Sequence, residues 1–353
     1  MAYTTIDDPS AYFNTLLWTG NGADNRALTN NANAGNFQPD FVWVKGRSQA
    51  EWHNVYDSSR GANKGLYPNS TYQEESLSQT FESFDTNGFT VSYNSAYNSV
   101  FTNKNSTTYV AWQWKVNGGT TTSLSSNINS VCQVNQDAGI SIVKYTCTGG
   151  GNGQAVQHGL GLVPQVIITK NRTDNSYSDW ITYHHYLTKD NFVKLNSTAA
   201  LATNSPYNGA NVTSTTYNVS IDLVEQKDYV TYCFAPIQGY SKFDSYEGNS
   251  NANGPFIYTG FKPAFVMLKP VDIAEQWVMH DGTRDPFNKA YHYLFANGAE
   301  AEASGGTHHI DLLSNGFKIR TSNNNWNPSS TVIYMAFAEN PFVTSTGIPT
   351  TAR

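Results

Sequence analysis

The chain is poor in charge, in helix-forming residues and in cysteine, and each shortage excludes a class of protein. Charged side chains make up 14% of the 353 residues, no more than the aromatic ones. Asn, Thr and Gly recur every few residues, which disfavours long amphipathic helices and favours short strands joined by polar turns. The composition therefore predicts an all-β protein with little helix.

No basic face and no long apolar run is visible. The 27 acidic residues outnumber the 21 basic ones, and no block of Lys or Arg occurs, so we expect no nucleic acid as a partner. No apolar run approaches the roughly 20 residues that span a bilayer. The first residues, MAYTTIDD, lack the basic and apolar regions of a signal peptide. We expect a chain made in a cytoplasm, without membrane insertion.

The positions of the cysteine and histidine residues favour neither disulfide bonds nor a metal site. Cys132, Cys147 and Cys233 are odd in number and form no CxxC spacing, so we expect buried thiols. Histidine pairs occur at 184–185 and 308–309, but neighbouring residues on a strand point to opposite faces. Neither a metal nor a cofactor is expected.

One motif occurs three times in the chain. It is an apolar run that follows a proline and ends in lysine. Because the run is apolar on both faces, it predicts a strand inside a packed core. The copies are FQPDFVWVK at 37–45, LVPQVIITK at 162–170 and FKPAFVMLK at 261–269.

The features around the motif keep their order in each copy. A lone tryptophan follows (Trp52, Trp180, Trp277), then a segment of Leu and Asn, and finally an aromatic strand. The first and third copies share an Asn-Gly-Phe turn, at 87–89 and 315–317, which is typical of a tight hairpin. Repeats of roughly 100 residues with many short strands fit β-sandwich or jelly-roll modules. We therefore expect three related β-sandwich domains in tandem.

The domain boundaries follow from composition. The polar stretch VNGGTTTSLSSNIN favours a flexible linker between the first two repeats, whereas the junction of the second and third is short. The predicted organisation is repeat 1 at 1–117, a linker at 118–139, repeat 2 at 140–239, repeat 3 at 240–342 and a C-terminal tail at 343–353.

Most of the recurring residues are interpreted as structural. The recurring aspartates Asp57 and Asp281 lack a matching second acid or base, so no catalytic residue is predicted. The motif lysines are expected to extend from a buried strand to solvent, pairing with these acids. The interpretation as repeat core applies to Phe41, Trp43, Trp52, Val166, Trp180, Phe265 and Trp277.

Tyrosines confined to one repeat are the candidates for ligand binding. They are predicted to lie in Asn- and Ser-rich loops, where binding residues tend to collect. The candidates are Tyr93, Tyr97, Tyr207 and Tyr217.

Longer motifs resemble a family of repeat-containing proteins of marine tailed phages. They are AYTTIDDPSAYF at 2–13, the run at 37–45, GYSKFDSY at 239–246 and YMAFAENP at 334–341. The resemblance implies a virion or tail-fibre location and lectin-like β-sandwich domains.

Two functions stay open on that basis. The first is a non-enzymatic tail-fibre or appendage module that contacts host-surface polysaccharide. The second is a protein that decorates or cements the capsid or tail by binding other virion proteins. A glycan-degrading enzyme is the third and weakest alternative. Phage appendages are commonly trimeric, so copies of the same chain are expected as partners.

Overall fold

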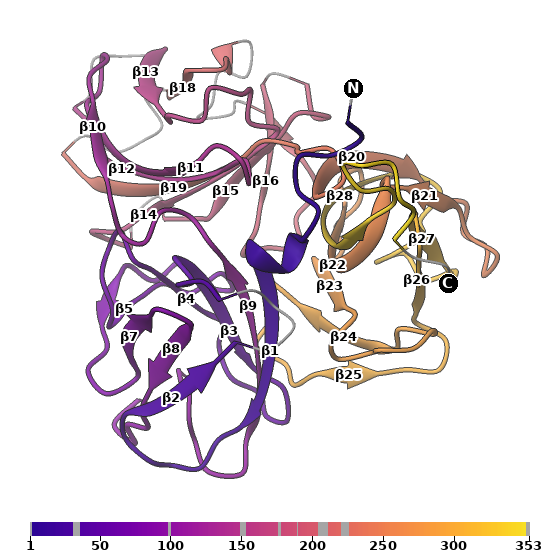
Figure 1. Cartoon of the computed structure of the whole chain (residues 1–353), viewed down its shortest axis with the longest axis horizontal. Helices are drawn as coiled ribbons and strands as arrows, with labels where there is room; N and C mark the ends of the chain where they lie inside the picture. The colour runs from indigo at the N-terminus through magenta and orange to yellow at the C-terminus, as the bar shows by residue number, and fades with distance from the viewer. Residues whose placement is uncertain are drawn as a thin grey trace.

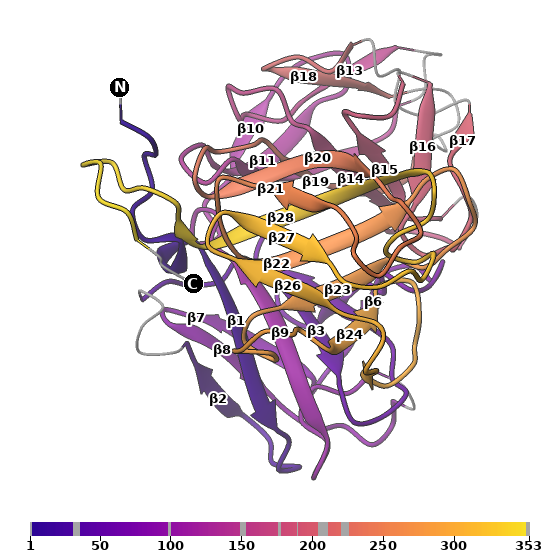
Figure 2. The ribbon, with the colours of Figure 1, turned by 90° about the vertical axis from the view of Figure 1, so that its right-hand side faces the viewer.

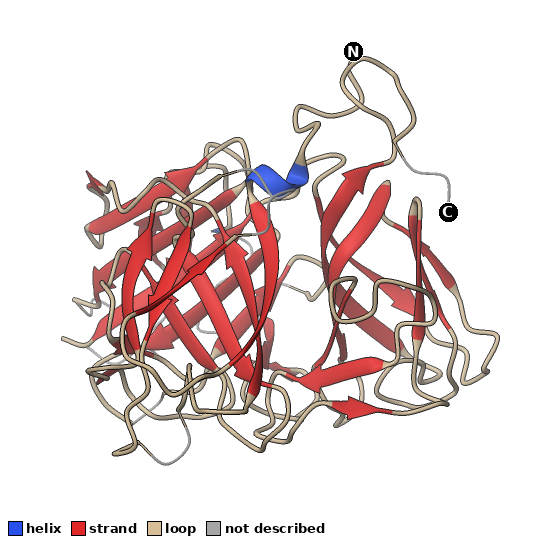
Figure 3. Ribbon diagram, turned by 60° about the horizontal axis from the view of Figure 1, so that its bottom comes forward, coloured by secondary structure: helices blue, strands red, loops and turns tan. Residues whose placement is uncertain are grey.

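The computed structural model describes residues 2–30, 36–97, 100–148, 153–175, 178–188, 190–203, 211–219 and 226–350. The described chain is built from antiparallel sheets, as the strands of Figure 3 show. Helix is confined to short turns such as η1 (Pro9–Ala11), where the Asp8 side chain accepts from the Ser10 amide. The expected all-β fold is confirmed.

The first repeat folds into two facing sheets. Its strands are β1 (Phe13–Thr19), β2 (Arg26–Thr29), β3 (Phe41–Gly46), β4 (Asn54–Asp57), β5 (Lys64–Gly65), β6 (Glu75–Ser76), β7 (Phe81–Asp85), β8 (Gly88–Val91) and β9 (Thr108–Trp114). The larger sheet has the order β1-β9-β3-β4 and the smaller one the order β2-β8-β7. Val42 and Val44 of β3 pack with Tyr56 and Phe89 in the core between these sheets. The Asn-Gly turn joins β7 to β8, as predicted.

The second repeat has the widest sheet. Its strands are β10 (Thr122–Leu124), β11 (Ser130–Asn135), β12 (Ile140–Thr146), β13 (Gln154–Gln157), β14 (Val166–Asn171), β15 (Ile181–His184), β16 (Asn191–Lys194), β17 (Ala202–Thr203), β18 (Thr216–Val219) and β19 (Asp228–Phe234). The sheet order is β10-β11-β12-β19-β14-β15-β16-β17, and β13 pairs with β18 in a second sheet.

The predicted linker at 118–139 is therefore wrong over much of its length. Strands β10 and β11 lie within it and extend the sheet of the second repeat. Its polar residues alternate with Leu124, Cys132 and Val134, which contact the core of that repeat. The alternation places the apolar residues on one face of the sheet, so a polar composition is compatible with strands here.

The third repeat repeats the two-sheet plan. Its strands are β20 (Ser241–Glu247), β21 (Phe256–Tyr258), β22 (Phe261–Pro270), β23 (Val278–Asp281), β24 (His292–Phe295), β25 (Ala303–Ser304), β26 (Ile310–Leu313), β27 (Gly316–Ile319) and β28 (Thr331–Pro341). The large sheet has the order β20-β28-β22-β23-β24-β25 and the small sheet the order β21-β27-β26. The second Asn-Gly turn joins β26 to β27, again as predicted.

Strand register shows that the repeats correspond residue by residue. The motif residue Phe41 lies opposite Asp57, and Phe265 lies opposite Asp281 in the same way. In this register His53, and not Trp52, is the equivalent of Trp180 and Trp277.

A side-chain hydrogen bond confirms the one-residue correction at Trp52. The His53 amide donates to Asn69 Oδ1, as the Trp180 amide donates to Asn196 Oδ1. Trp52 is half-buried instead and packs against Tyr67. A shift of one residue moves a side chain to the other face of a sheet, so aligning the tryptophans alone was misleading.

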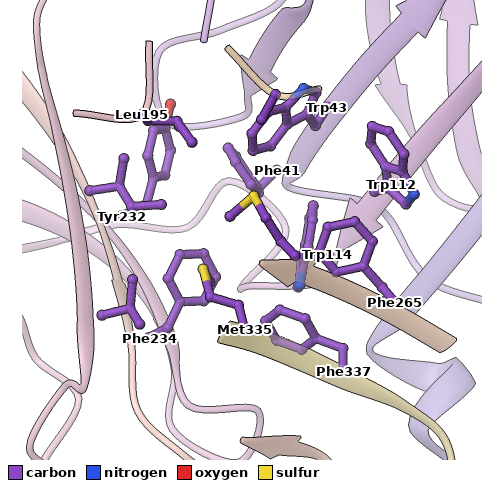
Figure 4. Packing of buried hydrophobic residues seen from close by; sticks show 14 of the residues in the cluster. Phe41, Trp43, Trp112, Trp114, Leu195, Tyr232, Phe234, Phe265, Met335 and Phe337 are labelled. Atoms are coloured by element: carbon purple, nitrogen blue, oxygen red, sulfur yellow. The ribbon is translucent and has the colours of Figure 1, made fainter. Parts of the chain in front are cut away.

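The three repeats close around one shared core. Each large sheet directs one face outward to its own sandwich and the other face inward. Trp114, Phe234 and Phe337, which are equivalent residues, meet with ring centroids 5.4 to 6.5 Å apart. Figure 4 shows this cluster with Phe41 and Phe265 beside it. The chain therefore forms three lobes around a centre (Figure 1).

The start of the chain and the C-terminal tail lie on the same side of the molecule (Figure 2). The Tyr3 hydroxyl donates to the Gly260 carbonyl at 2.7 Å, which ties the first residues to the third repeat. In the tail, the Ser345 amide donates to Asp7 Oδ1 at 2.6 Å. The tail thus lies against the start of the chain, and its residues 351–353 fall outside the described residues.

Candidate functional site

Each repeat carries a buried lysine at the end of its motif strand. Lys45 Nζ donates to the Glu51 carbonyl of its own repeat at 2.7 Å and to the Ala299 carbonyl of the third repeat at 3.1 Å. Burial lowers the pKa of Lys45 to about 8, although the nearby carboxylates of Glu51 and Glu300 oppose the shift. This lysine therefore ties the first repeat to the third.

The other two lysines make the same contact with their neighbours. Lys170 donates to the Thr71 carbonyl of the first repeat at 3.0 Å, and Lys269 donates to the Thr198 carbonyl of the second at 2.9 Å. Burial lowers the pKa of Lys170 to about 7 and that of Lys269 to about 8. The expectation that the lysines extend to solvent is wrong, because their strands end inside the joints between repeats and all three side chains are buried.

The recurring aspartates belong to the same joints. Asp57 forms a fully buried ion pair with Arg60, whose Nη1 lies 3.0 Å from Glu74. Glu74 in turn pairs with Arg172 of the second repeat at 2.9 Å. The Tyr232 hydroxyl, also from the second repeat, donates to Asp57 Oδ2 at 2.7 Å. Burial by itself would raise the pKa of Glu74, but Arg172 and Arg60 hold it below its usual value.

The joint between the first and third repeats has the same chain of charges. Asp281 pairs with Arg284 at 2.5 Å, and Arg284 reaches Glu302 at 2.9 Å. Glu302 pairs with Arg47 of the first repeat at 2.7 Å. Trp112 Nε1 donates to Asp281 Oδ2 at 3.0 Å, in the place of the tyrosine.

In the described residues of the joint between the second and third repeats, apolar side chains replace the outer charges of the other two joints. Leu201 and Val271 occupy the places of the outer glutamate and arginine, and the Leu201 amide donates to the Val271 carbonyl at 2.7 Å. His184 and Leu187 stand where the other repeats have aspartate and arginine. The recurring ionisable residues thus hold repeats together, and the sequence pairing of lysine with aspartate is wrong.

One histidine of each pair is buried, namely His184 and His309, whereas His185 is exposed and His308 is half-buried. His184 Nε2 lies 3.3 Å from the Tyr334 carbonyl, and burial lowers the pKa of His184 to about 3. His308 stacks on Trp326 with centroids 5.2 Å apart, and its Nε2 lies 3.1 Å from Asn323 Nδ2. Over the described residues, no group of three or more His, Cys, Asp or Glu side chains could hold a metal ion.

The three cysteines are buried thiols, as expected from the sequence. Burial raises the pKa of Cys132 to about 11, so its thiol is unreactive near neutral pH.

The tyrosines predicted to bind a ligand do not form one surface. Tyr217 lies in strand β18 and is fully buried, so it cannot stack on an external ring. Tyr93 and Tyr97 are half-buried and pack against the core of the first repeat. Tyr207 lies outside the described residues.

A polar groove lies where the first repeat meets the two added strands of the second. Tyr12 and Lys115 of the first repeat form one wall, and Lys115 Nζ lies 5.6 Å from the centroid of the Tyr12 ring. Exposed Gln136 and Asp137, from the loop after β11, form the opposite wall. The groove has a volume of about 600 Å³, within the range of small-ligand sites.

The groove offers groups of both charges. Burial raises the pKa of the Tyr12 hydroxyl, and the negative charge of Asp137 adds to the shift. Within the described part of the chain, neither Lys115 Nζ nor the Asp137 carboxylate forms an ion pair or hydrogen bond with another side chain. Such groups are available to a polar ligand.

One family model matches the chain over most of its length. Residues 8–341 match the model described as "Domain of unknown function (DUF7483)". The chain belongs to this family. The match spans all three repeats of the DUF7483 chain. No curated protein and no solved structure matches it. In the described part of the DUF7483 chain, no helix is long and apolar enough to cross a membrane.

No sequence pattern indicated the groove residues. Tyr12, Lys115 and Asp137 belong to no repeated motif, and two of them lie at the ends of repeat 1. The available signal was the polar stretch at 118–139, which has no counterpart between the second and third repeats. Its polar composition predicted a linker and did not indicate strands β10 and β11.

Proposed function

We propose that the DUF7483 chain is a non-enzymatic structural protein on the surface of a tailed-phage particle and that it contacts host-surface glycans. The motifs that resemble phage virion proteins support the location. One observation supports binding and not catalysis: the repeated ionisable residues have a structural role. Asp57, Asp281 and the three motif lysines are buried in the joints between repeats, where no substrate reaches them.

The fold supplies a rigid body for such a role. Three sandwich cores and one shared core order the described strands. Binding groups on a rigid scaffold lose little conformational entropy when a ligand binds. The groove beside β10 and β11 is polar, partly aromatic and open, which suits a saccharide.

The closed arrangement also bears on assembly. Phage appendages commonly use three chains, but here three repeats of one chain complete a central core. A homotrimer is thus not needed to bury Trp114 and its equivalents. Any self-association would use outer surfaces.

The test compares two targets for labelled protein. Purified fluorescent DUF7483 chain is added to host cells and, separately, to phage particles that lack it. Saturable binding to cells, competed by extracted surface polysaccharide, is the expected result. Binding to particles alone, with none to cells, would overturn the glycan proposal.

A second function is favoured by one exposed strand. Strand β21 lies at the edge of the small sheet in the third repeat, and its Phe256 and Tyr258 are 45% and 49% exposed. An exposed strand edge with apolar side chains can add a strand from another protein. Capsid or tail decoration through this edge predicts binding to particles, which the same experiment measures.

A further inference from the structure

The second repeat breaks the symmetry of the fold in one place. In the first and third repeats, β1 and β20 form the edge of the large sheet. In the second, β10 and β11 lie outside the equivalent strand β12. Strand β11 also contacts the first repeat, because buried Gln133 Nε2 donates to the hydroxyls of Ser58 and Ser59 at 2.9 Å. The added strands thus have no equivalent in the other two repeats, and they form the groove with Tyr12 and Lys115.

We propose that this groove binds a neutral oligosaccharide. This inference rests on the proposed function, because it names the groove as the site of the proposed glycan contact. The Tyr12 ring supplies an apolar face for a sugar ring, while Lys115 and Asp137 supply a donor and an acceptor for hydroxyl groups. Because these two charges have opposite signs, the groove has no excess charge that would select an anionic sugar.

The remaining wall of the groove is also suited to hydroxyl groups. Asn117, Thr120 and Thr122 line it and are exposed. Amide and hydroxyl side chains both donate and accept, as sugar hydroxyls do. Partly buried Leu124 and Val134 also line the groove. This mixture of a few apolar groups and convergent polar groups is typical of small-ligand sites.

The groove is held in shape before any ligand arrives. Asn135 Oδ1 accepts from the Ala138 amide at 3.0 Å, and Gln136 Nε2 donates to the Gly159 carbonyl at 3.0 Å. These bonds order the loop that carries Asp137. On the other wall, the Lys115 amide donates to the Tyr12 carbonyl at 2.9 Å. A preformed site lowers the entropic cost of binding.

The experiment uses the full chain and a printed array of neutral and uronic-acid-containing oligosaccharides, followed by titration of the best ligand. The groove variants are Lys115→Met, Asp137→Asn and Tyr12→Leu. Lys242→Met is the matched control, because Lys242 lies 5.7 Å from the centroid of the Tyr258 ring in a similar pair elsewhere. Circular dichroism and melting temperature report whether each variant folds.

We expect the wild-type chain to bind neutral oligosaccharides. Asp137→Asn and Lys115→Met should each weaken binding by about tenfold, the effect of losing a charged hydrogen bond. Lys242→Met should bind as the wild type does. Hydrogen exchange should show protection by the ligand in β10, β11 and the loop at 135–137.

Three outcomes would contradict the inference. Unchanged binding by the folded groove variants would place the saccharide elsewhere and leave the proposed function standing. Binding of acidic sugars alone would refute the neutral class. Absence of saccharide binding by the wild-type chain, on the array and on cells, would overturn both proposals.

Discussion

The buried ion pair between Asp57 and Arg60 gives the sharpest test of the joints between repeats. Both side chains have no exposed surface, and Asp57 also accepts from Tyr232 of the neighbouring repeat. Asp57→Asn keeps the shape but removes the negative charge, which leaves Arg60 with Glu74 alone, and Glu74 is shared with Arg172. Removing one partner of a buried pair costs about 3–5 kcal/mol. We expect this loss in the free energy of unfolding.

Equilibrium urea unfolding, followed by tryptophan fluorescence, measures the effect. The midpoint should fall while the dependence on urea stays constant, because the unfolded surface does not change. Asp244→Asn is the control, since the Asp244 side chain is 42% exposed and lies 3.7 Å from Lys242. An exposed pair contributes about 0–1 kcal/mol. A loss below about 1 kcal/mol for Asp57→Asn would refute the assignment of this pair to the stability of the joint.

The second repeat supplies a natural replacement for the pair. His184 and Leu187 occupy the places of Asp57 and Arg60. The double variant Asp57→His with Arg60→Leu removes both charges, so no buried arginine is left without its partner. Exchange of a buried pair for less charged residues is often close to neutral. The double variant should therefore lose less stability than Asp57→Asn, and a greater loss would contradict the argument.

Further predictions concern pH, the shared core and a turn. Four histidines that are at most 1% exposed have lowered pKa values, so the unfolded chain binds more protons below pH 6.5 and stability should fall as pH drops from 7 to 5, by up to about 2 kcal/mol per histidine. Glu51, whose pKa burial raises to about 7, offsets part of this fall; a melting temperature that is constant or rises over that range would contradict the prediction. Trp114→Ala should cost about 3–5 kcal/mol in urea unfolding because it empties the centre of the shared core, whereas Trp52→Ala at the half-buried position should cost less. Gly88→Ala should destabilise the β7–β8 hairpin, since a Cβ there would lie 2.0 Å from the Leu28 carbonyl oxygen at a φ of +116°, while Gly306→Ala, which meets nothing within 4 Å and has no positive φ, serves as the control in thermal melts. Equal losses for these two glycine variants would count against the steric argument.

The sandwich architecture of the individual repeats was accessible from local patterns. The continuous apolar run after each proline predicted the motif strands, and the Asn-Gly dipeptides predicted the β7–β8 and β26–β27 hairpins. The apolar character of both faces of β3 correctly indicated burial on both sides. Phe41 and Trp43 turn to the shared core, whereas Val42 and Val44 turn to the sandwich. The sequence pattern therefore indicated that both faces of β3 are buried. It did not indicate which residues of the other repeats complete the shared core.

The alignment of tryptophans shows where sequence comparison alone failed. Trp52 resembles Trp180 and Trp277 in type, yet strand register assigns their place to His53. His53 Nε2 lies 3.0 Å from the Phe295 carbonyl of the next repeat, while Trp180 Nε1 donates to the Tyr67 carbonyl at 2.7 Å. The imidazole of His53 and the indole of Trp180 thus contact backbone carbonyls at equivalent positions of the neighbouring repeats. Residue identity is therefore a weaker guide than hydrogen-bond geometry.

Local chemistry in the chain determined its strands, its turns and the threefold recurrence of its motif, because these depend on neighbouring residues and on side-chain periodicity. The joints depend on partners far apart in the chain, such as Lys45 with Ala299 and Asp57 with Tyr232. The groove likewise needs Tyr12 beside Asp137. Such contacts arise only when three sheets pack around one core, since packing decides whether a lysine reaches water or a neighbour's carbonyl.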